Sequence, residues 1–318
     1  MTYFVTGGTG LIGTRIVRDL VKEGENVIIY DLRPDMFLLK TLLNLDEINE
    51  RIKIVSGDIT DLPLLIKSLK DYSVTTIIHT ASLLVLDSNS NPLKALKTNC
   101  EGTICVFEAA KLCGISKVVW SSSNSVFGPS KKYTEKFIPN DAPHFPQNIY
   151  GTTKSFNESV ANYYFDEYGI EIIGIRYMHV YGSGQKRGFF GSLVKELVLN
   201  PSLGIPGKVT HSDAIIGWSY VDDPARATIM ASKVKLDKAK SYSIRGDIRT
   251  VKEVAEYVKN ILPKSEITCL PGSFTGDPVN LETNLIENDI GYKPKWTMEK
   301  GIKETINITR KENGLNLI

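Results

Sequence analysis

The sequence predicts an α/β fold, a Rossmann-type doubly wound parallel sheet with a smaller C-terminal substrate lobe. Three observations predict it. Short apolar runs alternate with helix-length segments through the first half of the chain. These runs are apolar throughout, which indicates strands buried on both faces, as in parallel sheets. A glycine-rich turn directly after the first run favours an open sheet over a closed barrel.

Strand-length and helix-length segments follow one another up to about residue 180. The expected helices are Leu11–Glu23, Leu62–Leu69, Pro92–Leu112 and Ile149–Tyr168, and the expected strands are Tyr3–Thr6, Val27–Asp31, Ile52–Ser56, Thr76–His79, Lys117–Ser121 and Glu171–Arg176. Strands joined by helices in this way pair in parallel through right-handed crossovers. We therefore expect residues 1–180 to form one Rossmann domain.

Beyond about residue 180 the alternation loosens, and glycines and prolines mark loops. Helix-length segments return at Gly191–Leu199, Pro224–Lys233, Val251–Ile261 and Met298–Lys311. We expect residues 181–318 to form the smaller substrate-binding lobe, with some segments returning to the first domain.

Composition excludes several classes of protein. The chain has 318 residues, of which 42% are hydrophobic, so it is not a disordered chain. Its 38 basic and 36 acidic residues leave a net charge of +2, too weak a field to gather nucleic acid or an anionic membrane. No window approaches the roughly 20 apolar residues of a spanning helix, and no secretory signal precedes the first strand. We expect a cytoplasmic protein without nucleic-acid or membrane partners.

The cysteines predict no disulfide and no metal site. Cys100, Cys105, Cys113 and Cys269 form no CxxC pair, and no histidine cluster has the spacing of zinc ligands. We expect reduced thiols packed as small apolar side chains.

The glycine-rich turn has the spacing of a dinucleotide-binding site. Gly7, Gly10 and Gly13 follow the first strand and open the first helix; Gly8, Gly10 and Gly13 give an equivalent reading. Glycines allow a tight turn and close approach of a pyrophosphate, which the helix N-terminus then binds through backbone N–H groups, here those near Leu11 and Ile12.

Asp31 ends the second strand, 18 residues after Gly13. A carboxylate there accepts hydrogen bonds from the adenosine ribose and repels a 2′-phosphate, which favours NAD over NADP. Arg33 keeps NADP open as an alternative. We expect NAD as the cofactor of residues 1–180.

Tyr150 and Lys154 lie four residues apart at the start of an expected helix, so they share one face. A tyrosine is a poor base at neutral pH, but a neighbouring ammonium favours its phenolate. Tyr150 could then remove a proton from a substrate hydroxyl, and Lys154 could also hold the cofactor.

Together these motifs resemble the extended short-chain dehydrogenases/reductases of the NAD-dependent epimerase/dehydratase family, over nearly the whole chain. The resemblance implies Ser123 as the catalytic hydroxyl, in a Ser121–Gly128 segment similar to the family's SSxxVYG, with Ser122 and Ser125 as fallback candidates. It implies substrate contacts from Ser123, Asn124, Ser125 and His179. It implies a cofactor site built from Gly7, Gly10, Leu11, Ile12, Gly13, Asp31, Asp58, Ile59, Thr80, Ala81, Ser82, Asn99, Ser121, Tyr150, Lys154, Tyr177 and Val180.

Two departures from the family pattern bear on the reaction. Members that catalyse 4,6-dehydration carry Asp-Glu after the catalytic hydroxyl, where this chain has Asn124 and Ser125, so dehydration is disfavoured. Sugar-nucleotide members place asparagine and arginine where this chain has His179 and Ile216, and a further arginine before the Gly-Asp that matches Gly276-Asp277. Possible replacements for the phosphate-binding side chains are Lys186, Arg187, Lys208 and Arg249.

The expected function is NAD-dependent hydride transfer on a secondary alcohol of a sugar or sugar nucleotide, of 4-epimerase rather than 4,6-dehydratase type. One alternative is a dehydrogenase of a small hydroxy compound similar to L-threonine 3-dehydrogenases, which the Val126–Pro129 run resembles. Another is a non-catalytic NAD-binding regulatory protein. Relatives pair as dimers through the helices that match 92–112 and 149–168, so we expect a homodimer, with Tyr163, Tyr164 and Phe165 offering apolar surface.

Overall fold

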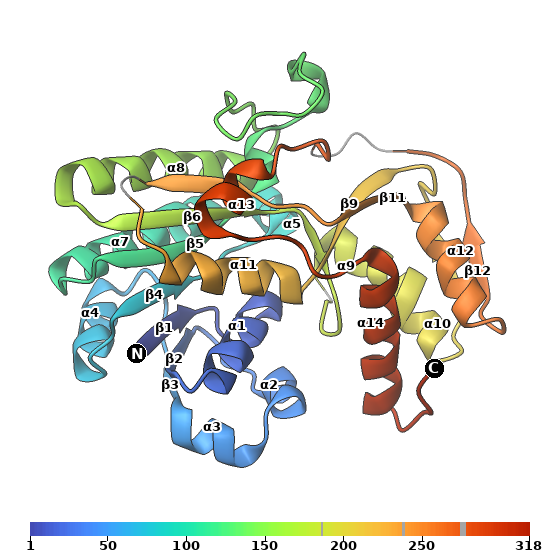
Figure 1. Cartoon of the computed structure of the whole chain (residues 1–318), viewed down its shortest axis with the longest axis horizontal. Helices are drawn as coiled ribbons and strands as arrows, with labels where there is room; N and C mark the ends of the chain where they lie inside the picture. Colours follow the sequence, from blue (N-terminus) through green and yellow to red (C-terminus); the bar gives the residue numbers. More distant parts are fainter. Residues whose placement is uncertain (186, 237–238, 274–277) are drawn as a thin grey trace.

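A parallel sheet forms the centre of the N-terminal part of the molecule (Figure 1). The computed structural model describes residues 1–185, 187–236, 239–273 and 278–318. The seven strands lie in the order β10-β6-β5-β4-β1-β2-β3, and every neighbouring pair is parallel. Their bounds are β1 Thr2–Thr6, β2 Asn26–Asp31, β3 Ile52–Ser56, β4 Thr76–His79, β5 Lys117–Ser123, β6 Glu171–Tyr177 and β10 Lys240–Ser243. The Rossmann-type fold expected from the sequence is confirmed.

Helices cover both faces of this sheet because its strands are apolar on both sides. One face packs on α4 (Leu62–Asp71), α7 (Gly102–Leu112) and α8 (Ile149–Tyr168). The other packs on α1 (Leu11–Lys22) and α11 (Asp222–Lys233), which contact each other. Short helices complete this part of the chain: α2 Phe37–Leu42, α3 Leu45–Arg51, α5 Val85–Ser90, η2 Asn124–Val126 and η3 Ser130–Lys132.

The expected single helix over Pro92–Leu112 is wrong in one respect. It is divided into α6 (Pro92–Ala95), a π-helical turn η1 (Leu96–Glu101) and α7. The carbonyl of Asn99, inside the π-helical turn, accepts hydrogen bonds from the Asn157 amide (2.7 Å) and the Thr103 hydroxyl (2.6 Å). A side chain of α8 thus bonds the backbone at the point where the helix departs from regular α-helical geometry. The periodicity of the sequence gives no indication of this π-helical turn.

The remaining chain forms a smaller lobe beside the sheet, on the right in Figure 1. Its core joins a three-stranded sheet, in the order β11-β9-β7, to helices that pack on it. A two-stranded sheet pairs β12 with β8. The elements are β7 His179–Tyr181, β8 Gly207–Val209, β9 Ile215–Tyr220, β11 Asp247–Thr250, β12 Ile267–Cys269, α9 Gly188–Val194, η4 Lys195–Leu199, α10 Asn200–Ser202, α12 Val251–Ile261 and α14 Met298–Glu312. The helix expected over Gly191–Leu199 therefore begins earlier, at Gly188, includes the π-helical turn η4 and continues into α10, which ends at Ser202.

Three segments from the second half of the chain lie on the seven-stranded sheet. Helix α11 packs on its face, β10 pairs with β6 at its edge, and α13 (Asn284–Ile290) contacts β10. The open side of β10 is covered by Asn140, whose amide donates to the Ser241 carbonyl and accepts from the Ser243 N–H at 2.9 Å. The Asn140 side chain thus pairs with backbone groups at the edge of the sheet that a further strand would otherwise bond. The boundary near residue 180 stays a prediction.

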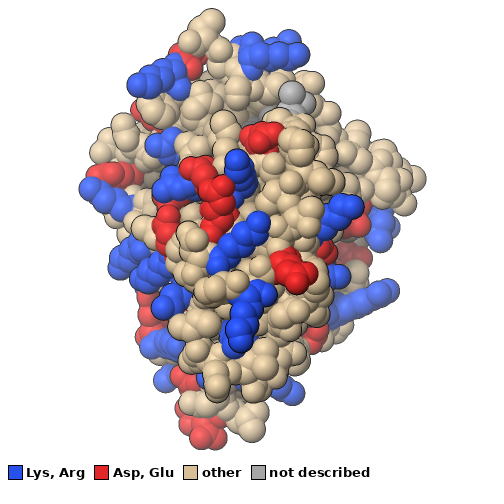
Figure 2. All heavy atoms as spheres, turned by 90° about the vertical axis from the view of Figure 1, so that its right-hand side faces the viewer, with Lys and Arg blue, Asp and Glu red and all other residues tan. Residues whose placement is uncertain are grey.

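Charges on the face of the smaller lobe are mixed in sign, with basic and acidic side chains interspersed (Figure 2). No helix in the described part of the chain is both long enough and apolar enough to cross a membrane. Within the same residues, no group of three or more His, Cys, Asp or Glu side chains is placed to hold a metal ion.

Candidate active site

The glycine-rich turn joins β1 to α1 and is built by close contacts of backbone with backbone. Gly7 has a φ of +65°, and a Cβ on it would lie 2.8 Å from the Ala81 nitrogen. A Cβ on Gly13 would lie 2.2 Å from the Gly7 carbonyl oxygen. The turn therefore requires the absence of a side chain at both positions, as its spacing predicts.

The first turn of α1 is open to an anion. Its N-cap is Gly10, which brings no side-chain hydrogen bond to the helix start, and the first intrahelical bond runs from Thr14 N–H to the Gly10 carbonyl. The N–H groups of Leu11, Ile12 and Gly13 precede that bond, so a phosphate would supply their acceptor. These residues fit the pyrophosphate of a dinucleotide.

Asp31 lies at the end of β2, beside the glycine-rich turn. Its carboxylate accepts hydrogen bonds from the Thr9 hydroxyl at 2.7 Å and the Thr9 N–H at 3.3 Å. Thr9 lies inside the turn, so these bonds place the carboxylate against the expected cofactor site. Asp58 follows the next strand, accepts from Thr60 and presents its carbonyl to Tyr30, while Ile59 is buried against Gly102.

A buried polar network connects the glycine-rich turn to α8. His79 lies between the hydroxyls of Thr6 (2.6 Å from Nδ1) and Thr103 (3.1 Å from Nε2). Asn99 then donates to Thr153, next to Lys154, at 3.3 Å. Burial lowers the pKa of His79 to about 3, so the ring is neutral and acts as a structural connector. Thr80 donates back to the Thr6 carbonyl, and Ala81 and Ser82 continue the segment.

Of the predicted catalytic residues, Tyr150 and Lys154 lie close together beside the carboxyl end of β5, the strand that Ser123 ends. Lys154 Nζ donates to the Ser121 carbonyl at 2.6 Å and lies 5.5 Å from the centre of the Tyr150 ring. Ser123 ends β5, and its hydroxyl accepts a hydrogen bond from the Ser125 N–H at 3.2 Å. The helix that carries Tyr150 and Lys154 begins at the Asn148 N-cap, whose side chain accepts from Gly151 N–H.

Burial lowers the pKa of Lys154 to about 7, although the nearby Cys100 and Glu158 partly raise it. Lys154 is therefore poised to gain or lose a proton near neutral pH. Such a shift is typical of functional sites.

Two further residues predicted near the cofactor lie at the end of β6 and in β7. The Tyr177 hydroxyl is 2.6 Å from the Thr228 hydroxyl of α11, and burial raises the pKa of Tyr177 above its usual value. Val180 is buried in the core of the smaller lobe. Both thus pack between the sheet and that lobe, at the ends of strands where ligands bind in such folds.

Aromatic and aliphatic side chains surround His179, a residue predicted to contact the substrate. The His179 ring lies 5.0 Å from Phe190, and Phe190 lies 5.3 Å from Trp218. Ile216, at the position where the family resemblance implies arginine, is fully buried in the same core. Asn124 donates to the Pro278 carbonyl at 3.4 Å.

The basic side chains that were considered as phosphate-binding replacements lie as follows. Arg249 pairs across the strands with Ile216, but its guanidinium donates to the Ile248 carbonyl and lies 3.9 Å from Glu299. Arg187 and Lys208 are exposed. Lys186 and the Gly276-Asp277 pair lie outside the described residues.

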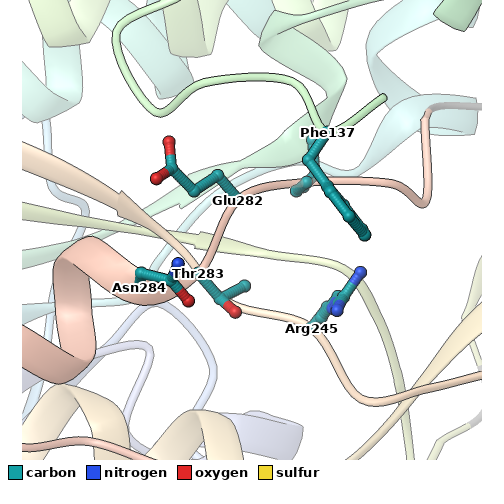
Figure 3. Close-up of a pocket in the computed structure, with 6 residues that line it drawn as sticks. Phe137, Arg245, Glu282, Thr283 and Asn284 are labelled. Atoms are coloured by element: carbon teal, nitrogen blue, oxygen red, sulfur yellow. The ribbon is translucent and has the colours of Figure 1, made fainter. Parts of the chain in front are cut away.

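Several tertiary contacts gave no signal in the sequence. Arg15, two residues after Gly13, is buried and donates to the Ser183 carbonyl at 2.8 Å, which ties α1 to the smaller lobe. A cavity of about 390 Å³ lies where three distant segments meet, and the Arg245 guanidinium faces the Phe137 ring across it at 5.3 Å (Figure 3). These pairings depend on tertiary contacts, which no local motif encodes.

A seven-stranded parallel sheet, a glycine turn that opens a helix and a Tyr–Lys pair at a strand end define a dinucleotide-binding enzyme of the Rossmann class. The model of the NAD dependent epimerase/dehydratase family matches residues 3–244. The chain belongs to this family.

Two relatives show what the chain is similar to. A putative UDP-glucose 4-epimerase of Methanocaldococcus jannaschii is 30% identical over 97% of this chain and 98% of its own length. UDP-glucuronate 4-epimerase 4 of Arabidopsis thaliana is 25% identical over 96% of this chain and 74% of its own.

Two solved structures share the fold. The UDP-glucose 4-epimerase of Thermotoga maritima, solved with UDP-glucose, matches with a TM-score of 0.83 at 24% identity, over 98% of this chain and all of that one. A monomeric L-threonine 3-dehydrogenase from a metagenome also matches with a TM-score of 0.83, at 23% identity over 98% and 99% of the chains. Because the two likenesses are equal, the fold alone does not distinguish an epimerase from a dehydrogenase.

Proposed function

We propose that this protein transfers hydride at a secondary alcohol of a sugar nucleotide, using NAD, as a 4-epimerase. The observation that supports the proposal is the position of Lys154, whose Nζ donates to the Ser121 carbonyl near the end of β5 and lies 5.5 Å from the centre of the Tyr150 ring. The names of the curated relatives support the substrate class.

The cofactor would be held by the glycine-rich turn and by Asp31. The open N–H groups at the start of α1 would bind its pyrophosphate, and the Asp31 carboxylate would accept from its adenosine ribose, which favours NAD over NADP. When bound, the nicotinamide supplies the hydride acceptor and donor.

Three side chains have separate roles in the proton transfer. Tyr150 takes the proton of the substrate hydroxyl and gives it back when the hydroxyl is restored. The Lys154 ammonium stabilises the Tyr150 phenolate through its charge. Ser123 hydrogen-bonds the reacting oxygen and orients it. Asn124 and Ser125 bring no carboxyl group, so the acid and base that sugar dehydration needs are not at these positions.

A second candidate is oxidation of a small, non-nucleotide alcohol. The buried Ile216 and the rings of His179, Phe190 and Trp218 favour it, since a diphosphate prefers bidentate, permanently charged donors. Here the reduced cofactor would be released.

The deciding experiment incubates the purified protein with NAD and UDP-sugars, dTDP-sugars, free sugars or hydroxy acids. It follows NADH absorbance and product configuration together. Inversion at C4 without accumulating NADH is expected. NADH accumulation with a small alcohol would establish the second candidate. Tight NAD binding without turnover of any alcohol would favour a regulatory protein instead.

We also propose a homodimer through α7 and α8. Tyr163 and Phe156 on α8 are 55% and 45% exposed, and Leu112 at the end of α7 is 53% exposed. Tyr164 is a correction to the expected surface: it is buried, stacked edge-on against Phe107 at 5.6 Å, with its hydroxyl on Glu108. Light scattering should give twice the chain mass, and Tyr163→Glu should give the monomer; a wild-type monomer would refute the proposal.

A further inference from the structure

Glu158 is a buried carboxylate to which the proposed reaction gives no role. It lies on α8 one turn after Lys154 and is 6% exposed. Its carboxylate accepts hydrogen bonds from the Ser122 hydroxyl at 2.5 Å and from two nitrogens of Arg176 at 2.8 and 2.6 Å. Burial favours its neutral form, but the charge and hydrogen bonds of Arg176 outweigh this and lower the pKa of Glu158. The group is therefore an ionised carboxylate at neutral pH.

The partners of Glu158 lie side by side in the sheet. Ser122 of β5 pairs directly with Arg176 of β6, so one carboxylate on α8 holds the ends of two neighbouring strands. The guanidinium has a partner for each of its nitrogens, since it also donates to the Asn140 carbonyl at 2.6 Å and approaches His144 Nε2 at 3.4 Å. It further lies over the Phe127 ring at 4.8 Å. Such a saturated ion pair has one geometry rather than several.

The residues on either side of Ser122 are the ones that the reaction uses. The carbonyl of Ser121 accepts a hydrogen bond from Lys154. Ser123, which carries the proposed catalytic hydroxyl, is the last residue of the strand. Because successive residues of a strand are rigidly linked, a shift of Ser122 would move both neighbours. A displacement of about 1 Å at such a position can cost about 100-fold in rate.

Building on the proposed function, we propose that Glu158 is a positioning residue. By holding Ser122 and Arg176 it fixes the end of β5, and thereby both the Ser121 carbonyl beneath Lys154 and the Ser123 hydroxyl that meets the substrate. Glu158 itself touches neither substrate nor cofactor.

The test compares Ser122→Ala with Ser159→Ala. Ser122→Ala removes one hydrogen bond and leaves the Glu158–Arg176 ion pair in place. Ser159 adjoins Glu158 on α8 but bonds only within the helix, so its loss is the matched control. Ser122→Ala should lower kcat about 10-fold, with KM and NAD affinity within about twofold of wild type. Ser159→Ala should change none of them. Glu158→Gln should lower kcat further where it folds.

Hydrogen exchange of the β5 peptide gives a second readout that is independent of turnover. Exchange over residues 117–125 should accelerate in Ser122→Ala and not in Ser159→Ala. A kcat within twofold of wild type in Ser122→Ala, or a change confined to KM, would overturn the proposal. If the wild type transfers no hydride at all, the proposed function fails, and exchange alone decides: faster exchange in Ser122→Ala supports positioning, and unchanged exchange overturns it.

Discussion

The end of β5 and the face of β9 differ in what holds their side chains. At the end of β5, Ser122 bonds Glu158 and the Ser121 carbonyl bonds Lys154, both within the protein interior. On β9, Ile216 and Trp218 pack in an apolar core, and Trp218 Nε1 also donates to the Arg249 carbonyl at 3.2 Å. Hydrogen bonds with defined directions dominate the first region, and apolar packing dominates the second.

The difference separates two requirements of an enzyme. Proton transfer depends on geometry within tenths of an ångström, so its residues are fixed by short, buried polar contacts. Substrate recognition can be met by many surfaces, and the His179 ring here lies 5.0 Å from the Phe190 ring. The residues proposed for proton transfer thus lie in a buried polar region, whereas the residues proposed for substrate contact include His179, which lies against aromatic side chains.

Replacing the proposed base, Tyr150, should lower the catalytic rate more than any other change to these two regions. Tyr150→Phe removes the phenolic hydroxyl and leaves the ring beside Lys154, so kcat should fall about 10³-fold, or about 4 kcal/mol in activation free energy. NAD affinity should stay within about twofold of wild type. Steady-state kinetics and a titration with NAD measure both, and turnover near the wild-type rate would rule out Tyr150 as the base.

Ile216→Arg tests the predicted substrate region, since it introduces the side chain that the family resemblance implies at this position. Ile216 has no exposed surface, so a guanidinium without a partner should lower the free energy of unfolding by about 3 kcal/mol. Denaturant unfolding measures the loss.

Ile215, the neighbour of Ile216, supplies the control for this substitution. Ile215 on the same strand is 58% exposed, and Ile215→Arg should change stability by less than about 0.5 kcal/mol. An Ile216→Arg variant that stayed as stable as wild type and gained affinity for UDP-sugars would show that this face readily accepts a diphosphate.

Gly13→Ala probes the cofactor turn, where backbone meets backbone. Its Cβ would lie 2.2 Å from the Gly7 oxygen, so the turn must open, at a cost of about 2–3 kcal/mol, and NAD binding should weaken with it. Gly10→Ala offers a graded comparison because its Cβ would lie 3.2 Å from the same oxygen. Thermal unfolding with and without NAD should rank wild type, Gly10→Ala and Gly13→Ala in that order; equal melting temperatures would contradict the close contact.

The sequence predicts the parts of this site whose geometry is local. Gly7, Gly10 and Gly13 have a spacing that one turn and one helix start impose, and Tyr150 and Lys154 share a face because a helix has 3.6 residues per turn. Those positions lie where expected, although their roles stay predictions.

Contacts between distant segments had no such signal. No local pattern in the sequence indicates that Glu158 bonds Ser122 or that Arg15 bonds Ser183. The same holds for the hydrogen bond from a side-chain amide of α8 to the Asn99 carbonyl in the π-helical turn. Each contact depends on how the elements pack. The buried state of Ile216 likewise follows from the fold of the smaller lobe, so sequence alone left open whether that position faces substrate or core.

Lys154 makes the stability of the folded protein depend on pH. Burial lowers the pKa of Lys154 to about 7, against about 10.4 in an unfolded chain. Between these values the unfolded chain binds the extra proton, so folding stability rises with pH, and the cost of the buried charge is complete below pH 7. Lys154→Met removes that cost. Its stability relative to wild type should be higher at pH 6 than at pH 9 by about 2 kcal/mol.

The difference between the two pH values isolates the charge, because the lost hydrogen bond to Ser121 weakens the variant equally at both. Lys70→Met, at an exposed lysine of α4, should leave the pH dependence of unfolding as in wild type. Denaturant unfolding of the protein without NAD at both pH values makes the measurement. A Lys154→Met curve parallel to wild type would mean that Lys154 keeps its ordinary proton affinity, and that the hydrogen bonds at the end of β5 compensate its burial completely.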